Sequence, residues 1–172
     1  GASKIHVVEN GFDESAFADA DARIRSRPPA TPEIGQSLTL LHSGVIYPDE
    51  RDPTCLFDAL ALLKSRSDPV ANRLILKLRA TGNDGLFQSM IDERRIGDIV
   101  RLEPAIDYVR ALEEMLTVDG LLILQAANCN AQIPAKLYEY FRAGRPIVAL
   151  TDPAGDTAGA LNGAGAGLIA PL

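Results

Sequence analysis

AANCNAQIPAKLYEYFRAGRPIVAL, residues 126–150, holds the alternation of elements on which the whole chain is built. An apolar run at 121–124 leads into a loop of small and polar residues, 126–132, and a helix is predicted at 134–143. A second apolar run follows at 147–150. Strand, loop, helix and strand in this order are typical of a βαβ unit in a parallel sheet.

The same alternation continues along the rest of the chain. Pro134 suits the first position of the central helix, where its missing N–H costs nothing, and Gly144 suits the residue after its end. Strands are predicted at 38–42, 73–80, 99–102, 119–125, 147–150 and 167–170, and helices at 54–65, 85–95, 105–116, 134–143 and 155–161. The predicted fold is therefore α/β, a Rossmann-like, doubly wound parallel sheet with helices on both faces.

Ligands of such sheets bind beyond the carboxyl ends of the strands, where helix N-termini offer free N–H groups. The 126–133 loop occupies this place. The candidate binding residues at this loop and at the start of the following helix are Asn128, Gln132, Ile133 and Pro134.

The central helix carries a charged stripe of Lys136, Glu139 and Arg142. Leu137 and Phe141, four residues apart, form the side expected to face the sheet. Periodicity alone favours an exposed Lys136–Glu139 ion pair worth about 0.2–0.5 kcal/mol. The alternative is that the charges belong to a binding site.

The order of residues favours the site. Pro134, Lys136 and Glu139-Tyr140, followed by an aromatic residue, Ala-Gly and a basic-Pro-apolar strand, resemble retaining nucleotide-sugar glycosyltransferases of the two-domain GT-B fold. The likeness is to the donor-binding, C-terminal domain of the group 1 (family 4) enzymes. It implies that Glu139 binds the ribose hydroxyls, since an ionised carboxylate accepts from both hydroxyls of a diol.

One position departs from the family pattern. The family often has an earlier glutamate, with seven residues intervening, that contacts the sugar, and here Ala131 stands there. The donor sugar is therefore not determined by the sequence. Backbone groups of the loop, or Asn128, Asn130 and Gln132, are expected to replace the glutamate.

The first strand is followed by residues that the resemblance places beside the donor diphosphate. Gly44 matches the glycine of that region, and its N–H is expected to stabilise the phosphates. Arg51 is the sole basic residue there before Lys64, where the family usually has an Arg and a Lys. An equally weighted alternative is that Arg51 pairs with Asp49 or Asp52 on the surface.

The resemblance also assigns roles to three further positions. Arg51 and Lys136 are the candidate catalytic residues, because they would stabilise the leaving nucleoside diphosphate. Glu103 follows the third strand, where the family holds the nucleotide base. His42 is predicted to be a packed strand-end residue, and no cluster of metal ligands is seen in the sequence.

The N-terminal part is predicted to be an interdomain segment and linker, residues 1–37, ahead of a donor-binding domain at 38–172. Residues 10–13, NGFD, match the segment with which the family's interdomain region often ends, and 13–37 are polar and then proline-rich. The resemblance implies that the N-terminal acceptor domain is missing, so the 172-residue chain alone is not expected to transfer sugar.

Composition bounds the remaining possibilities. The chain has 47% hydrophobic residues, a net charge of −6 and a pI of about 4.9, which argues against a nucleic-acid partner. Cys55 and Cys129 are too few for a disulfide framework. Reduced cysteines, the absence of a signal peptide and the absence of a run of about 20 apolar residues predict a cytoplasmic protein.

The predicted function is donor binding for metal-independent sugar transfer with retention. The donor would be a nucleotide-sugar such as a UDP- or GDP-hexose, no separate cofactor is expected, and the acceptor is an unknown glycan, lipid or small molecule. The alternatives are a non-catalytic nucleotide- or sugar-binding module and an epimerase-like enzyme of related architecture.

Overall fold

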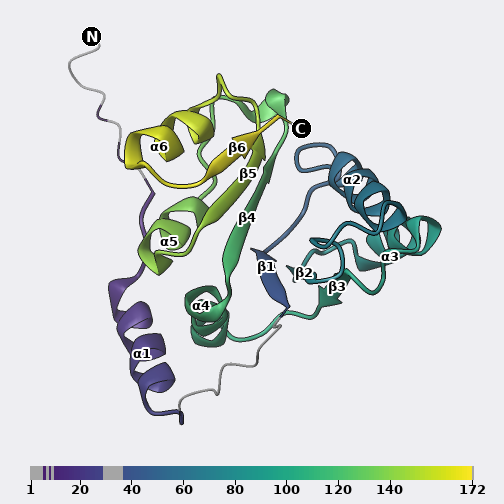
Figure 1. The fold of residues 1–172 in the computed structure, drawn as a ribbon. Helices are drawn as coiled ribbons and strands as arrows, with labels where there is room; N and C mark the ends of the chain where they lie inside the picture. The colour runs from purple at the N-terminus through teal and green to yellow at the C-terminus, as the bar shows by residue number, and fades with distance from the viewer. Residues whose placement is uncertain (1–5, 7, 9, 29–36, 172) are drawn as a thin grey trace.

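The computed structural model of this chain describes residues 6, 8, 10–28 and 37–171. Its centre is a parallel sheet of six strands in the order β3-β2-β1-β4-β5-β6 (Figure 1). The strands are β1 (Leu38–Ser43), β2 (Leu74–Arg79), β3 (Val100–Glu103), β4 (Gly120–Gln125), β5 (Ile147–Thr151) and β6 (Leu168–Ala170). This is the strand order of a doubly wound Rossmann-like sheet, so the predicted fold class is confirmed.

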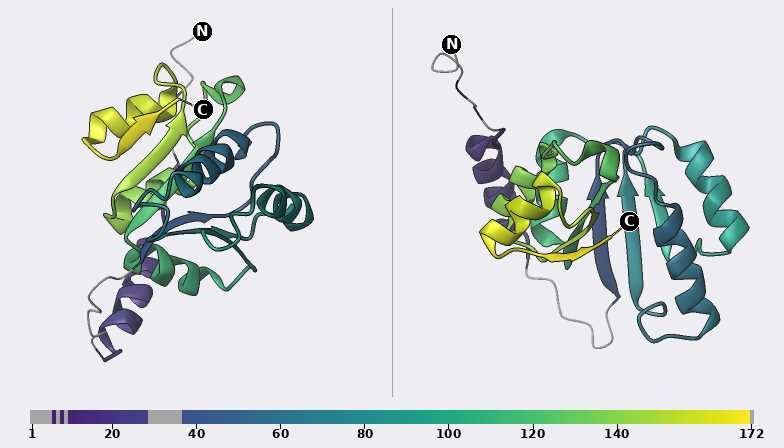
Figure 2. Two further views of the ribbon diagram at one scale, coloured as in Figure 1. Left: turned by 45° about the vertical axis from the view of Figure 1, so that its right-hand side comes forward. Right: turned by 90° about the horizontal axis from the view of Figure 1, so that it is seen from above.

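Helices cover both faces of the sheet (Figure 2). They are α1 (Glu14–Arg25), α2 (Thr54–Ser65), α3 (Asp84–Arg94), α4 (Tyr108–Thr117), α5 (Lys136–Ala143) and α6 (Asp156–Ala164). The core side chains of α2 and α3 pack on one face, and those of α4, α5 and α6 pack on the other. None of the helices in the described part of the chain has the length and apolar character of a membrane span.

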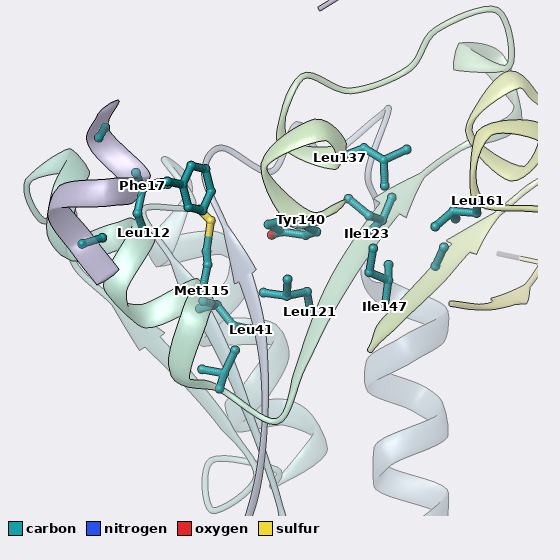
Figure 3. Close-up of a cluster of buried hydrophobic side chains, with 14 residues drawn as sticks. Phe17, Leu41, Leu112, Met115, Leu121, Ile123, Leu137, Tyr140, Ile147 and Leu161 are labelled. Carbon is teal, nitrogen blue, oxygen red and sulfur yellow. The ribbon is translucent and has the colours of Figure 1, made fainter. Parts of the chain in front are cut away.

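Strand β4 shows why the sequence folds this way. All six of its residues are buried, so it has no polar side, as expected for a strand covered on both faces. Leu121 and Ile123 belong to the cluster beneath α4 and α5 (Figure 3), whereas Leu122 and Leu124 belong to the cluster beneath α2. The continuous apolar run in the sequence therefore fills two cores.

The order in which the strands are added to the sheet reverses between the two central strands, β1 and β4. Strand β1 is followed along the chain by β2 and β3 on one side, and β4 is followed by β5 and β6 on the other. The loops that leave β1 and β4 meet at the carboxyl end of the sheet, where the Ala126 N–H donates to the Glu50 carbonyl at 2.7 Å. The candidate residues of the 44–53 and 126–133 segments lie on these two loops.

The predicted elements after residue 37 are all present, with small shifts at their ends. Helix α4 begins at Tyr108, later than the predicted residue 105, because the Asp107 side chain caps it by accepting from the Arg110 N–H at 3.1 Å. Helix α5 begins at Lys136, but the Leu137 N–H donates to the Pro134 carbonyl at 2.9 Å. The turn that leads into α5 thus starts at Pro134, as predicted.

The prediction that residues 13–37 form a linker or surface excursion is wrong for α1. Asp13 caps this helix by accepting from the Ser15 and Ala16 N–H groups. Phe17 and Ala20 are fully buried, and Phe17 contributes to the same core as α4 (Figure 3). Most of the predicted linker's proline-rich part, 29–36, lies outside the described residues. The proposed division of the chain at residue 37 stays a prediction.

Candidate functional site at the carboxyl edge of the sheet

Lys136 is the side chain that reaches from α5 to the carboxyl end of β1. It lies in the first turn of α5, and its Nζ approaches Nε2 of His42 on β1 to 2.8 Å. The same Nζ would lie only 3.3 Å from a Cβ placed on Gly44. The lysine therefore reaches from α5 over the end of β1, and its charged end covers Gly44.

Gly44 has a φ of +105°, a conformation that side-chain-bearing residues rarely adopt. Its N–H donates to the Arg79 carbonyl at 2.9 Å. The prediction that this N–H faces the diphosphate is therefore wrong in this structure. What the glycine provides is space, since a Cβ here would press against the end of Lys136.

Arg51 approaches the same place from the loop after β1. One of its guanidinium nitrogens donates to the Val45 carbonyl at 2.9 Å, and the group lies over the Tyr47 ring at 5.1 Å. The alternative of a surface ion pair is not supported, because no described ion pair includes Arg51 and Asp52 accepts from Thr54 instead. The structure thus brings Arg51 and Lys136 together.

Burial and a neighbouring positive charge both disfavour the charged form of Lys136. Burial, followed by the Arg51 charge, lowers the pKa of Lys136 to about 7, while Glu139 acts in the opposite direction. Burial also holds the pKa of His42 well below its ordinary value, with Lys136 as the next cause. A bound anion would favour the charged lysine, so the site is suited to an anionic ligand.

Glu139 lies one turn beyond Lys136 on α5. It forms no ion pair among the described residues, and its Oε1 accepts from the Tyr108 hydroxyl at 2.7 Å. Burial, followed by this hydrogen bond, raises the pKa of Tyr108 to about 12. The predicted exposed pair of Lys136 and Glu139 is therefore not formed, and each side chain is held by a partner from another element.

The third member of the predicted stripe has a different role. Arg142 forms ion pairs with Glu14 at 2.7 Å and Asp21 at 3.3 Å, and its guanidinium lies 4.9 Å from the centre of the Phe17 ring. It therefore fastens α1 to α5. Of the residues predicted to face the sheet, Leu137 is buried and Phe141 is partly buried.

Tyr140, which follows Glu139, is fully buried beneath this edge of the sheet. Its hydroxyl accepts from the Ser43 N–H at 3.0 Å. This bond fixes α5 to the last residue of β1. The positions of Lys136 and Glu139 relative to Gly44 are therefore set by a bond between the two elements that carry them.

A pocket of about 210 Å³ adjoins Gly44. Its lining comes from the ends of β1 and β2, the loop after β3 and the start of α4: Ser43, Gly44, Arg79, Ala80, Ala105, Ile106, Tyr108 and Ala111. Glu103, the predicted base-binding residue, does not line it. The Glu103 carboxylate lies 3.8 Å from Arg79 instead.

The loop after β4 is held closely by its neighbours. The Asn128 side chain donates to the Asp49 carbonyl at 3.3 Å, and the Asn130 side chain donates to Asp152 at 2.6 Å. The Oδ1 of Asn130 is buried, with no hydrogen-bond partner among the described residues. Of the three candidates to replace the family's glutamate, only Gln132 has an exposed side chain without a described hydrogen bond.

The two remaining predicted binding residues of this loop, Ile133 and Pro134, contribute to packing near the start of α5. Ile133 packs against the core beneath α5, and Pro134 is buried. A second opening of about 420 Å³ lies at the same edge of the sheet. It is lined by Ala126, Ala127, Asp152, Pro153 and Pro171.

The site as built consists of Gly44, Arg51, Lys136 and Glu139. Two further residues contact the site: His42, which is packed at the strand end as predicted and also bonds to Lys136, and Tyr108. Neither contact can be predicted from neighbouring residues in the sequence, because His42 lies 94 residues from Lys136 and Tyr108 lies 31 residues from Glu139. No group of three or more acidic, histidine or cysteine side chains suited to a metal occurs among the described residues.

The fold and site define a Rossmann-like domain with two basic side chains, Arg51 and Lys136, at its switch point. No protein-family model matches the sequence, and no curated protein matches it. Solved structures do match. One is WaaG, a glycosyltransferase involved in lipopolysaccharide biosynthesis, with a TM-score of 0.64 and 15% identity over 99% of this chain and 44% of that one.

Two trehalose-phosphate synthases match in the same way. One is the trehalose-6-phosphate synthase OtsA, with a TM-score of 0.63, 14% identity, and coverage of 94% of this chain and 39% of that one. The other is the UDP-forming enzyme from Burkholderia xenovorans, solved with glucose-6-phosphate, with a TM-score of 0.64 and the same identity and coverage. The chain spans less than half the length of these proteins. At such identities the likeness shows the fold alone, a Rossmann-like parallel sheet that this chain shares with part of each of these proteins.

Proposed function

We propose that this chain is the donor-binding domain of a retaining, metal-independent glycosyltransferase that takes its sugar from a UDP- or GDP-hexose. The observation that carries the proposal is the meeting of Arg51 and Lys136 at the switch point, where neither forms an ion pair with a described residue. A nucleotide-sugar supplies the missing anion as its diphosphate. The GT-B fold of the matched structures agrees with this assignment.

The reaction accounts for the two cations. As the glycosidic bond breaks, negative charge grows on the leaving nucleoside diphosphate. Arg51 and Lys136 would stabilise that charge, and fixed cations near the leaving oxygens lower the barrier because they need no reorganisation. They would fill the role that a divalent metal has in other sugar transfers. No separate cofactor is needed for this chemistry.

Glu139 would bind the ribose of the donor. Tyr108 donates to Oε1, and the remaining lone pairs of the carboxylate can accept from a ribose hydroxyl. The pocket beside Gly44 is lined by the ends of β1 and β2 and by Tyr108, the residue whose hydroxyl donates to this carboxylate. Ala105 and Ile106, rather than Glu103, line the side where the base would lie.

The sugar end of the donor would be recognised by the loop after β4. Asn130 is committed to Asp152, and Asn128 to Asp49, so Gln132 is the side chain most able to replace the glutamate that Ala131 lacks. The acceptor, which could be a glycan, a lipid or a small molecule, would be bound by another domain. Cytoplasmic location stays a prediction.

One observation favours a second candidate, a non-catalytic module that binds nucleotides or sugars. Ala131 offers no polar side chain where the family's enzymes hold the sugar, and the nearby Asn130 amide is turned away from solvent. Such a module would bind the donor without transfer. A transfer assay on a protein that also carries an acceptor domain separates the two, and epimerised sugar among the products would indicate the epimerase-like alternative.

A thermal-shift screen of UDP, GDP, ADP and their hexose derivatives tests the proposal. A ligand at 100 times its Kd stabilises the fold by about 2.7 kcal/mol, which corresponds to roughly 5–10 °C in Tm for a chain of this size. Lys136→Met should reduce the shift by about half or more, as expected when binding weakens at least about tenfold. Lys64→Met is the matched control, because Lys64 pairs with Asp98 far from the site. A wild-type protein that no nucleotide stabilises would contradict the proposal.

A further inference from the structure

His42 has an arrangement that its packing alone does not require. It is fully buried near the end of β1, and its Nδ1 lies 3.0 Å from the Leu122 carbonyl of β4. A carbonyl oxygen can only accept, so Nδ1 carries the proton and Nε2 is left with a lone pair. That lone pair points to the end of the lysine of α5.

Lys136 completes the chain of contacts. Its Nζ lies 2.8 Å from Nε2 of His42 and therefore donates to it. Arg51 repels the lysine from the β1 loop, and Glu139, itself bonded to Tyr108 of α4, attracts it from α5. The imidazole is the neutral acceptor that holds Nζ against β1 between these charges.

We propose that His42 is a positioning residue for Lys136: it touches no ligand, but its Nε2 holds the lysine nitrogen over Gly44, where the diphosphate binds. The inference rests on the function proposed above. It explains why a histidine, rather than an apolar residue, occupies a fully buried strand position. It also explains how a long, flexible side chain keeps one place before the ligand arrives.

Two substitutions separate this role from a purely structural one. An asparagine amide reaches about as far as Nδ1 of histidine, so His42→Asn retains the bond to Leu122 and loses Lys136. A glutamine amide reaches about as far as Nε2, so His42→Gln retains the contact with Lys136 and loses Leu122. A positioning role predicts that only the asparagine variant weakens anion binding. A role in joining β1 to β4 predicts the reverse order.

Inorganic pyrophosphate is the probe for a double-mutant cycle by titration calorimetry. His42→Asn should weaken its binding about tenfold, the loss of one hydrogen bond to a charged group. His42→Gln should stay within about threefold, which counts as rescue. In a Lys136→Met background, His42→Asn should have almost no effect, since His42 acts through the lysine. An equal loss in both backgrounds would overturn the proposal.

Nitrogen NMR of the imidazole tests the contact without any ligand. The chain has two histidines, so the His42 signals are assigned by their loss in His42→Gln. Lys136→Met should move the Nε2 signal toward the value of a nitrogen that accepts no hydrogen bond, and Nδ1 should stay protonated. An unchanged Nε2 signal would refute the inference. If the signal moves but pyrophosphate does not bind, the proposed function fails and the contact stands.

Discussion

Proton uptake on donor binding follows directly from the environment of Lys136. Without a ligand, burial and Arg51 hold the pKa of this lysine at about 7. A diphosphate beside it would raise that pKa, so binding should draw a proton onto the amine. With a pKa of about 7, the free lysine is about 10% protonated at pH 8 and about 90% protonated at pH 6. Binding should therefore take up about 0.9 proton at pH 8 and about 0.1 at pH 6.

Calorimetry in buffers of different ionisation enthalpy measures this uptake. UDP-glucose and GDP-glucose are suitable ligands, because a diphosphate esterified at both ends does not titrate between pH 6 and 8. Neighbouring groups should not interfere, since the pKa of His42 lies well below its ordinary value and that of Tyr108 is about 12. Affinity should fall as the pH rises through 7, because the charged form of the lysine becomes rarer.

Lys136→Arg is the matched control for this experiment. Arginine keeps the positive charge but stays protonated in proteins, so its variant should show almost no uptake at either pH. Equal proton uptake at pH 6 and pH 8 in the unmodified protein would show that Lys136 does not titrate near pH 7. Uptake at pH 8 that persists in Lys136→Arg would assign the proton to another group.

Three other outcomes are expected. Phe17→Ala should lower the free energy of unfolding by about 3–5 kcal/mol in urea denaturation, because Phe17 is fully buried between α1 and α4. Phe12→Ala, at a 43% exposed ring, should cost clearly less, and equal losses would mean that α1 does not dock. Glu139→Gln should weaken nucleoside-diphosphate binding by about 1.5–3 kcal/mol, with little further loss on a 2′,3′-dideoxy ligand; the same loss on both ligands would assign Glu139 to the fold. Because the fold lowers the pKa of Lys136 from 10.5 to about 7, the unfolded chain binds the extra proton between these values. The unfolding free energy should rise with pH in this window more steeply than in Lys136→Met, and parallel curves would contradict the shift.

Local patterns were enough to predict the sheet and its covering helices. The bounds of α2 agree with the prediction, and the continuous apolar run of β4 identified a strand covered on both faces. Such patterns are set by neighbours along the chain. They fix the order of strands and helices, and this order places the loops after β1 and β4 at one edge.

The errors come from contacts between distant segments. Helix α1 is polar along most of its length, and its few apolar residues are buried only because α4 and Arg142 of α5 lie against them. Glu103 forms an ion pair with Arg79, and the Arg79 side chain also binds Glu114 and the Pro104 carbonyl. The spacing of residues along the sequence does not predict these contacts.

Contacts between distant segments also explain why the sequence predicted only part of the site. Helical spacing put Lys136 and Glu139 on one side of α5, but it paired them with each other. In the folded chain a residue from β1 and one from α4 hold them apart. Gly44, predicted to lie beside the donor diphosphate, lies beside Lys136, and its N–H is used within the sheet.

Arg51 and Lys136 together are proposed to form the diphosphate site. Titration calorimetry of a nucleoside diphosphate and of the matching nucleoside, with the unmodified protein, Arg51→Ala and Lys136→Ala, measures how much each side chain contributes to phosphate binding. We predict that each substitution weakens the diphosphate at least about tenfold, as expected for a lost charge-assisted bond, and changes nucleoside binding less than about twofold. Equal effects on the two ligands, or unchanged diphosphate binding in both variants, would contradict the account.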